Sequence, residues 1–223
     1  MYDFNILILE DETIIRMHIV KTLKAIGCKN IYTAKTYAEA LILASRYRFH
    51  ILFSDIKLEN SQYDGIDTAK ALQKLQNPIV IFITAYNDKE ILSRVTEVKF
   101  IGYLLKPYRI DEMETLLSLA IKKCDFSANK KCILTSGIYN FDMRDNSLYR
   151  EECKIDLSKK ERLFFALLFN NRSVLVPYSL IEEMVWYGES VSGNTRRTFI
   201  YRLKKRFPDL DLQIIKNDGL LLH

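Results

Sequence analysis

Five polar residues in the first half of the chain each lie at the end of a strand-length apolar segment or directly after one: Glu10, Asp11, Asp55, Thr84 and Lys106. Converging carboxylates repel one another unless a cation neutralises them, and their oxygen atoms suit magnesium (Mg²⁺). A lysine and a threonine hydroxyl beside such a cluster complete a site for a small, highly charged anion such as a phosphoryl group. Phosphoryl transfer needs mainly positioning and charge neutralisation, which these residue types supply.

The elements that must position these residues alternate regularly over the first 122 residues. The apolar runs are Asn5–Leu9, Asn30–Ala34, His50–Ser54, Ile79–Thr84 and Phe100–Leu104. The segments with helical spacing are Glu12–Ile26, Tyr37–Tyr47, Asp64–Leu75, Lys89–Val98 and Arg109–Lys122. This alternation predicts a doubly wound α/β fold, with a five-stranded parallel sheet covered on both faces. Because the carboxyl ends of parallel strands meet at one edge, we expect the polar residues to converge there.

A second domain is predicted after a break in this pattern. Residues 123–131 are polar and unpatterned, which indicates a linker between domains at 1–122 and 132–223. Short β-like pieces over Cys132–Ile155 come first in the second domain, and three helical segments follow them: Ser158–Asn170, Tyr178–Trp186 and Asn194–Phe207. The chain closes with Leu212–Ile215 and Leu220–Leu222, separated by a turn with Asp-Gly that favours a hairpin. This order of elements predicts a winged helix-turn-helix α+β domain.

The composition excludes several classes of protein. Hydrophobic residues make up 48% of the chain and charged residues 27%, which is typical of a folded soluble protein. No apolar run approaches the roughly 18 residues of a membrane span, and the N-terminus lacks the basic region of a signal peptide. The four cysteines and three histidines are scattered without metal-ligand spacing. We therefore expect no zinc site and no disulfide framework, in a cytoplasmic protein.

The net charge of +5 is unevenly distributed. Residues 1–122 hold 16 Lys/Arg and 15 Asp/Glu, whereas residues 123–223 hold 17 and 13. The segment Arg196–Arg206 contains six basic residues and no acidic one. Charge alone leaves two interpretations open, a polyanion partner for the second domain or a solvated basic helix face.

The polar residues at the strand ends resemble, in order and spacing, the receiver domain of two-component response regulators. The resemblance runs from about residue 3 to residue 122. It implies that Asp55 is the phosphoacceptor, which receives a phosphoryl group from the phosphohistidine of a sensor histidine kinase. It also implies that Asp11 and Asp55 bind Mg²⁺ directly, that Glu10 binds it through water, and that the backbone carbonyl of Lys57 is a further ligand.

The same resemblance assigns the remaining receiver residues. Lys106 would pair with one phosphoryl oxygen and Thr84 would donate a hydrogen bond to another. Tyr103, three residues before Lys106, would be the switch aromatic that moves into the space vacated by Thr84. Two positions depart from the family pattern. The loop Ile56–Asp64 is longer and lacks proline, and Leu116 replaces an arginine that commonly joins two receivers.

Residues 132–223 resemble the DNA-binding domain of the OmpR/PhoB type. The matching pieces are Leu157–Glu161, Leu180-Ile181, Val185-Trp186, Arg202–Lys205 and Ile215–Gly219. Ser158 and Glu161 have the spacing of a helix capping box. Arg196 lies where the family prefers an apolar residue, and Leu220 replaces an aromatic residue that usually follows the wing glycine.

The third helical segment of this domain has two different sides. The side expected to face the core holds Phe199, Ile200, Leu203 and Phe207. The opposite side would enter the major groove of double-stranded DNA, and it holds Arg197, Thr198, Tyr201, Arg202 and Lys205. Arg197 and Arg202 would reach guanine edges or phosphates, and Tyr201 bases or sugars. Lys204, Lys205 and Lys216 are predicted to neutralise phosphates.

Together these features predict a regulator in which aspartyl phosphorylation controls sequence-specific DNA binding and transcription. It would not be an enzyme, because the receiver would catalyse only its own phosphorylation and dephosphorylation. The predicted partners are a sensor histidine kinase, promoter DNA, RNA polymerase and a second copy of the chain bound through the receiver, with no membrane. Two alternatives stay open, a signalling adaptor whose second domain binds protein or RNA and a regulator that works independently of phosphorylation. A phosphatase of the haloacid-dehalogenase type is disfavoured, because its first strand ends in Asp-x-Asp and this one ends in Glu10-Asp11-Glu12.

Overall fold

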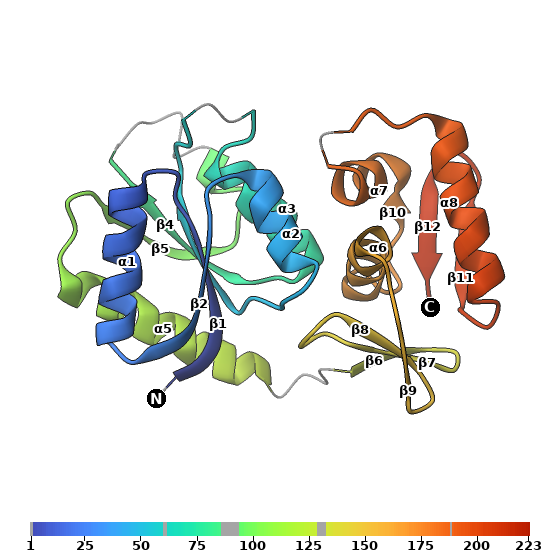
Figure 1. Cartoon of the computed structure of the whole chain (residues 1–223), viewed down its shortest axis with the longest axis horizontal. Helices are drawn as coiled ribbons and strands as arrows, with labels where there is room; N and C mark the ends of the chain where they lie inside the picture. Colours follow the sequence, from blue (N-terminus) through green and yellow to red (C-terminus); the bar gives the residue numbers. More distant parts are fainter. Residues whose placement is uncertain (1, 60–61, 86–93, 129–132, 188) are drawn as a thin grey trace. The chain divides into compact units, whose positions relative to one another are not determined.

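The chain forms two compact units, Met1–Lys130 and Lys131–His223. The computed structural model describes residues 2–59, 62–85, 94–128, 133–187 and 189–223. Figure 1 shows the first unit in blue to green and the second in yellow to red. The first unit has one sheet and the second has two, and each unit has its own buried core.

The first unit is built on a five-stranded parallel sheet with the strand order β2-β1-β3-β4-β5. The strands are β1 (Tyr2–Leu9), β2 (Cys28–Ala34), β3 (Ile51–Asp55), β4 (Ile79–Thr84) and β5 (Phe100–Leu105). Every residue of β3 is buried, which explains why Ile51–Phe53 are apolar without alternation, and Ser54 and Asp55 are buried polar residues at its carboxyl end. The order reverses between β1 and β3, and ligands bind beyond the carboxyl ends of the strands at such a point.

Helices cover both faces of this sheet (Figure 1). They are α1 (Thr13–Ala25), α2 (Tyr37–Ala44), α3 (Gly65–Leu75) and α5 (Ile110–Ala128). Buried side chains of α1 and α5 share one hydrophobic core with alternate residues of the strands, and α2 packs beside α3. The prediction of a doubly wound α/β fold is confirmed. The first half of the predicted helix Lys89–Val98, residues 89–93, lies outside the described residues.

Helix α5 continues to Ala128, beyond the predicted end at Lys122, and includes residues 123–128 of the predicted linker. The apolar spacing continues past the predicted end. Leu117, Ala120, Ile121 and Cys124 are all buried in the core shared with the sheet. Burial of this stripe holds the extra turns in place, so residues 123–128 belong to the helix and not to the linker.

The second unit begins with a four-stranded antiparallel sheet in the order β6-β7-β8-β9. Its strands are β6 (Ile133–Ser136), β7 (Tyr139–Asp142), β8 (Ser147–Arg150) and β9 (Cys153–Ile155). Helix α6 (Lys159–Asn170) follows and starts with the predicted capping box, in which Ser158 Oγ accepts from the Glu161 amide at 3.3 Å. Seven consecutive apolar residues of α6, Leu163–Phe169, are buried, so the helix is covered on all sides over this stretch.

The rest of the second unit is a helix-turn-helix followed by a hairpin. Helices α7 (Tyr178–Val185) and α8 (Gly193–Arg206) precede the hairpin of β11 (Leu212–Ile215) and β12 (Gly219–Leu222). Strand β12 also pairs with the short β10 (Val176–Pro177), so the hairpin is attached to the helices through a three-stranded sheet. This confirms the predicted winged helix-turn-helix architecture.

Two predictions from composition concern the thiols and the membrane. Cys28 and Cys124 are buried and Cys153 is exposed, and each is a free thiol. Cys132 lies outside the described residues. Across the ranges that the structure describes, no helix combines the length and the apolar character needed to cross a bilayer.

Candidate functional site

The carboxyl edge of the parallel sheet brings together residues from four strands. Glu10 follows β1, Asp55 ends β3, Thr84 ends β4 and Lys106 follows β5. The strand registers keep these ends level with one another. In addition, the Lys106 amide donates to the Thr84 carbonyl at 2.8 Å. The strand ends therefore meet as expected from a parallel sheet.

Lys106 joins two of the three carboxylates at this edge. Its Nζ lies 2.5 Å from Asp55 Oδ2 and 2.8 Å from Glu10 Oε2. The other oxygen of Asp55, Oδ1, accepts a hydrogen bond from the Lys57 amide at 3.2 Å. Asp11 lies at the rim, where its Oδ2 accepts from the Glu59 amide at 2.8 Å. The nucleophilic candidate is thus fixed on both of its oxygens.

Burial makes the charge of this cluster unfavourable unless a cation is present. Glu10 is fully buried, and burial together with the nearby charge of Asp55 raises its pKa to about 7, against the hydrogen bond from Lys106. Burial opposes the charge on Lys106, but hydrogen bonds to Asp55 and Glu10 outweigh it and raise the pKa of the ammonium group. Lys106 therefore stays charged and compensates for only part of the negative charge around it.

The three carboxylates are close enough to share one cation. One oxygen atom each of Glu10, Asp11 and Asp55 lies within 4.8 Å of the other two. A hard divalent ion such as Mg²⁺ takes carboxylate oxygens and keeps several waters, which fits a partly open cluster with one rim residue. The donor set and the excess negative charge thus both fit the predicted ion.

Arg16, a buried arginine that no sequence motif identified, holds the turn after β1 that carries Glu10 and Asp11. Arg16 of α1 is 8% exposed, and its Nη1 donates to the carbonyls of Glu10 at 2.7 Å and Asp11 at 3.0 Å. Its Nη2 donates to the Thr13 hydroxyl at 3.1 Å. The guanidinium therefore holds the backbone of the turn that carries two of the three acids. The one available signal was a charged residue on the buried side of an amphipathic helix.

Thr84 and Tyr103, the predicted switch pair, lie in different environments. Thr84 is buried at the end of β4. Tyr103 of β5 is 46% exposed, and it lines a hollow of about 430 Å³ with residues of α5 that include Thr115 and Leu116. The ring thus points to the surface of the β5–α5 face in this structure.

The raised pKa of Glu10 predicts how the stability of the metal-free protein depends on pH. Because the folded protein holds this proton more tightly than the unfolded chain, its stabilising effect is complete below about pH 4.5 and is lost as pH rises through about 7. We expect Glu10→Gln, which stays neutral, to flatten this part of the profile. Calorimetric unfolding in a chelator between about pH 5 and pH 8 measures it. Trp186, the single tryptophan, lies in the second unit, so its fluorescence follows the unfolding of that unit and serves as a reference for the first. Equal slopes for parent and variant would contradict the prediction.

Helix α8 forms a second candidate site in the other unit. All seven predicted nucleic-acid contacts are exposed: Arg197, Thr198, Tyr201, Arg202, Lys204, Lys205 and Lys216. On the opposite side of the helix, Ile200 and Leu203 are buried, and Phe199 packs edge-on against Phe164 and Trp186. The expected division of α8 into a core side and an exposed basic side agrees with these positions.

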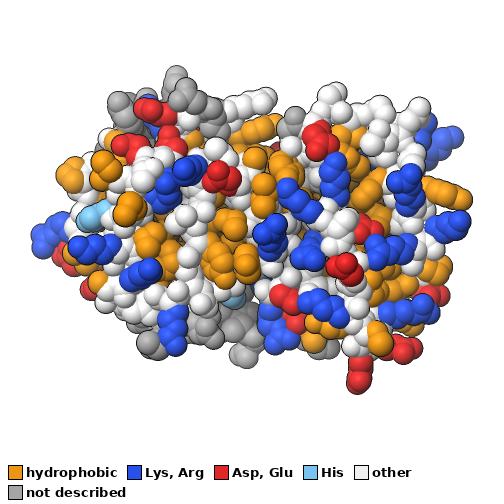
Figure 2. All heavy atoms as spheres, in the orientation of Figure 1, with side chains coloured by type: hydrophobic (Ala, Val, Ile, Leu, Met, Phe, Trp, Pro, Cys, Tyr) orange, Lys and Arg blue, Asp and Glu red, His pale blue; other side chains and the backbone are white. Residues whose placement is uncertain are grey.

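Helix α8 and the hairpin enclose a basic hollow of about 410 Å³. Four of the seven predicted contacts line it, namely Arg197, Tyr201, Lys204 and Lys216. Figure 2 shows lysine and arginine side chains gathered over this part of the second unit. Thr198, Arg202 and Lys205 lie outside the hollow. Exposed cations on both sides of a concave surface suit a polyanion such as the backbone of a nucleic acid.

Arg196 departs from the family pattern for a reason that the structure makes visible. Its Nη1 donates to Glu182 Oε1 of α7 at 2.5 Å, and its guanidinium lies 4.1 Å from the centre of the Tyr178 ring. The side chain is 19% exposed. An ion pair and a stacked ring thus join α7 to α8, where the family pattern has apolar packing.

Comparison with known proteins agrees with this geometry. Residues 6–118 match the family described as the response regulator receiver domain. The chain belongs to this family. The matched range includes the whole acidic edge of the sheet, so the cluster around Asp55 lies within the receiver domain. The protein is a response regulator of the two-component type.

Individual relatives extend the similarity to different lengths. The transcriptional regulatory protein PdtaR of Mycobacterium tuberculosis is 27% identical over 53% of this chain, and the chain spans 57% of its length. The response regulator protein GraR of Staphylococcus epidermidis is 21% identical over 93% of this chain and 92% of its own. Among solved structures, the receiver domain of a modulated diguanylate cyclase from Desulfovibrio desulfuricans covers 56% of this chain and 98% of its own, with 30% identity and a TM-score of 0.51.

Proposed function

We propose that this response regulator accepts a phosphoryl group on Asp55 from a sensor histidine kinase, and that the modification controls sequence-specific binding of its second domain to promoter DNA. The observation that carries the proposal is the contact of Asp55 Oδ2 with Lys106 Nζ at 2.5 Å, inside a cluster of three acids at the sheet edge. A carboxylate in such a place can attack phosphorus and form an aspartyl phosphate.

Each residue of the cluster has a separate role in the proposed transfer. An Asp55 oxygen forms a bond to phosphorus while the bond between phosphorus and the imidazole nitrogen of the kinase breaks. Lys106, which is placed against Asp55, pairs with a phosphoryl oxygen as charge moves toward the receiver. Thr84, at the end of the neighbouring strand, would donate a hydrogen bond to another phosphoryl oxygen.

Glu10, Asp11, Asp55 and the backbone carbonyl of Lys57 would hold Mg²⁺ at this site. The bound ion would neutralise the carboxylates and draw negative charge from the phosphoryl oxygens. Arg16 fixes the carbonyls of Glu10 and Asp11 and so holds this turn in one geometry. Asp11 is oriented by the Glu59 amide, which belongs to the loop that follows Asp55.

The second domain supports the DNA-binding half of the proposal. Its α8 exposes a basic side whose residues share a hollow with the hairpin. In this arrangement α8 reads the major groove, and Lys216 on the hairpin neutralises a phosphate. RNA polymerase and a second copy of the receiver are further proposed partners. We also infer that the chain acts on no separate substrate and catalyses only changes of its own phosphorylation.

An electrophoretic shift against genomic DNA fragments, with and without acetyl phosphate and Mg²⁺, tests this function on the full chain. We expect a subset of fragments to be retarded, and the retardation to increase when the phosphodonor is present. RNA fragments of equal length serve as the matched control for charge. Equal retardation with and without the donor would favour a regulator independent of phosphorylation. Retention of RNA alone, or of no nucleic acid, would favour the adaptor.

A further inference from the structure

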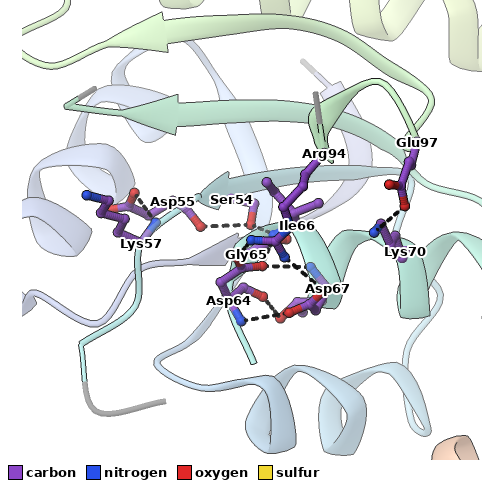
Figure 3. Close-up of polar contacts among 11 residues, drawn as sticks. Ser54, Asp55, Lys57, Asp64, Gly65, Ile66, Asp67, Lys70, Arg94 and Glu97 are labelled. Atoms are coloured by element: carbon purple, nitrogen blue, oxygen red, sulfur yellow. Dashed lines mark hydrogen bonds and ion pairs between the residues drawn. The ribbon is translucent and has the colours of Figure 1, made fainter. Parts of the chain in front are cut away.

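Three ion pairs, formed by the two cations Arg94 and Lys70, connect α3 and its cap with the segment that precedes β5 (Figure 3). Arg94 contacts two carboxylates at once, with Nη1 at 2.6 Å from Asp64 Oδ2 and Nη2 at 3.1 Å from Asp67 Oδ1. About one turn further along α3, Lys70 Nζ lies 2.6 Å from Glu97 Oε2. Both cations join the same two segments, but only Arg94 contacts the end of α3 nearest to the sheet edge.

Both carboxylates held by Arg94 also form the cap of α3. Asp64 Oδ1 accepts from the amides of Ile66 and Asp67 at 2.9 Å each, and Asp67 Oδ2 accepts from the Asp64 amide at 3.3 Å. Each carboxylate therefore uses one oxygen for the helix end and the other for the guanidinium. Arg94 neutralises two neighbouring negative charges and fixes the orientation of the whole cap.

The capped end of α3 lies directly against the backbone of the phosphoacceptor. A Cβ atom at Gly65 would fall 1.7 Å from the Asp55 carbonyl oxygen, so only glycine fits at this approach. The Ser54 hydroxyl lies 3.2 Å from the carbonyl oxygens of both Asp55 and Gly65, and the Gly65 amide donates to the Ile56 carbonyl at 3.0 Å. Because close-packed groups transmit displacement, a movement of this helix end must move Asp55.

We propose that Arg94 is a positioning residue for the phosphoacceptor. By closing the cap of α3 it holds Gly65 against Asp55 and keeps the Asp55 carboxylate aligned for attack on phosphorus. The inference rests on the proposed phosphorylation of Asp55. The Arg94 side chain is 44% exposed, and ion pairs of that exposure add little to stability, so its effect is expected in the rate of phosphoryl transfer.

The test is phosphorylation of the full chain by acetyl phosphate and Mg²⁺, in which an Asp55 oxygen binds phosphorus and acetate leaves. We expect Arg94→Ala to lower the maximal rate about fivefold, with an unchanged half-saturating concentration of acetyl phosphate, because the nucleophile and not donor binding is displaced. Arg94→Lys, which can keep one of the two contacts, should recover part of the rate. Lys70→Ala is the matched control and should react like the parent.

Several outcomes would overturn the inference. The inference is overturned if Arg94→Ala reacts at the parent rate, even with a lower melting temperature. It is also overturned if Lys70→Ala loses as much of the phosphorylation rate as Arg94→Ala does. If Arg94→Ala does not fold, Asp67→Asn is the second variant: it removes the charge that Arg94 pairs with and leaves one acceptor oxygen for Arg94 and the Asp64 amide, while Asp64 still accepts from the Ile66 and Asp67 amides. An unchanged rate in that variant would overturn the inference as well. Failure of the proposed function is distinct, because the parent itself would then take up no phosphoryl group.

Discussion

Asp55→Asn is expected to abolish phosphorylation of the full chain by acetyl phosphate. The amide keeps the shape of the side chain but is too weak a nucleophile to attack phosphorus, so the rate should fall by about two orders of magnitude or more. Lys106 would also lose the charge of its nearest partner, at 2.5 Å, while its contact with Glu10 stays possible. Mass spectrometry of the intact chain and of the peptide that contains residue 55 measures the phosphoryl adduct.

Asp142→Asn is the matched control for this experiment. Asp142 is also buried and paired with a cation, Arg144, but it lies in the second unit and outside any acidic cluster of the described residues. We expect this variant to be phosphorylated like the parent. Residual adduct in Asp55→Asn at the parent level would show that another side chain accepts the phosphoryl group, and the assignment of Asp55 would have to be given up.

Much of the first unit was predictable because burial on both faces leaves a strong local pattern. Strands β3 and β4 begin with apolar runs, Ile51–Phe53 and Ile79–Ile83, and the polar residues after each run mark the carboxyl end of the strand. A parallel sheet then brings these residues to one edge whatever the details of the loops. Positions such as Asp55 and Lys106 could therefore be placed near each other although 51 residues separate them in sequence.

The boundaries were less predictable where burial continued beyond an obvious pattern. Residues 123–128 appeared polar enough for a linker, yet Ile121 and Cys124 extend the buried stripe of α5. Strand β1 starts at Tyr2 rather than Asn5, because its first residues pair with β2 across an irregular register. In both places a tertiary contact prolongs an element past the point where local spacing ends.

The supporting cations could not be found from the sequence alone. Arg16 lies on the buried side of an amphipathic helix and Arg196 at a position where the family prefers an apolar residue, but the groups that these residues and Arg94 bind depend on the fold. Arg94 contacts Asp64 30 residues away, and no periodicity relates the two. Arg196 meets Glu182 only because the helix-turn-helix brings α7 against α8. Motif spacing identifies reacting groups, whereas the groups that orient them emerge from packing.

Arg197→Ala is expected to weaken binding to a specific DNA duplex about tenfold, since a two-pronged contact with guanine contributes about 1–3 kcal/mol. Arg197 is exposed on α8 and lines the hollow that the hairpin closes, which places it where a base edge would lie. Fluorescence anisotropy with a retarded genomic fragment, and with a scrambled duplex of the same length, measures the change. The loss of affinity should be much smaller for the scrambled duplex, because an arginine that reads a base adds little to the binding of a duplex that lacks that base.

A comparison of Lys216→Ala with Arg197→Ala distinguishes a residue that neutralises phosphate charge from one that reads the base sequence. It lies on the hairpin at the other side of the same hollow, so Lys216→Ala should weaken both duplexes alike. It should also reduce the slope of log affinity against log salt by about one, the change expected when one phosphate contact is lost. Arg172→Ala, an exposed residue in the turn after α6 and outside the hollow, should change neither property. If all three variants weakened both duplexes equally, the attraction would be diffuse, and α8 would not be the element that reads sequence.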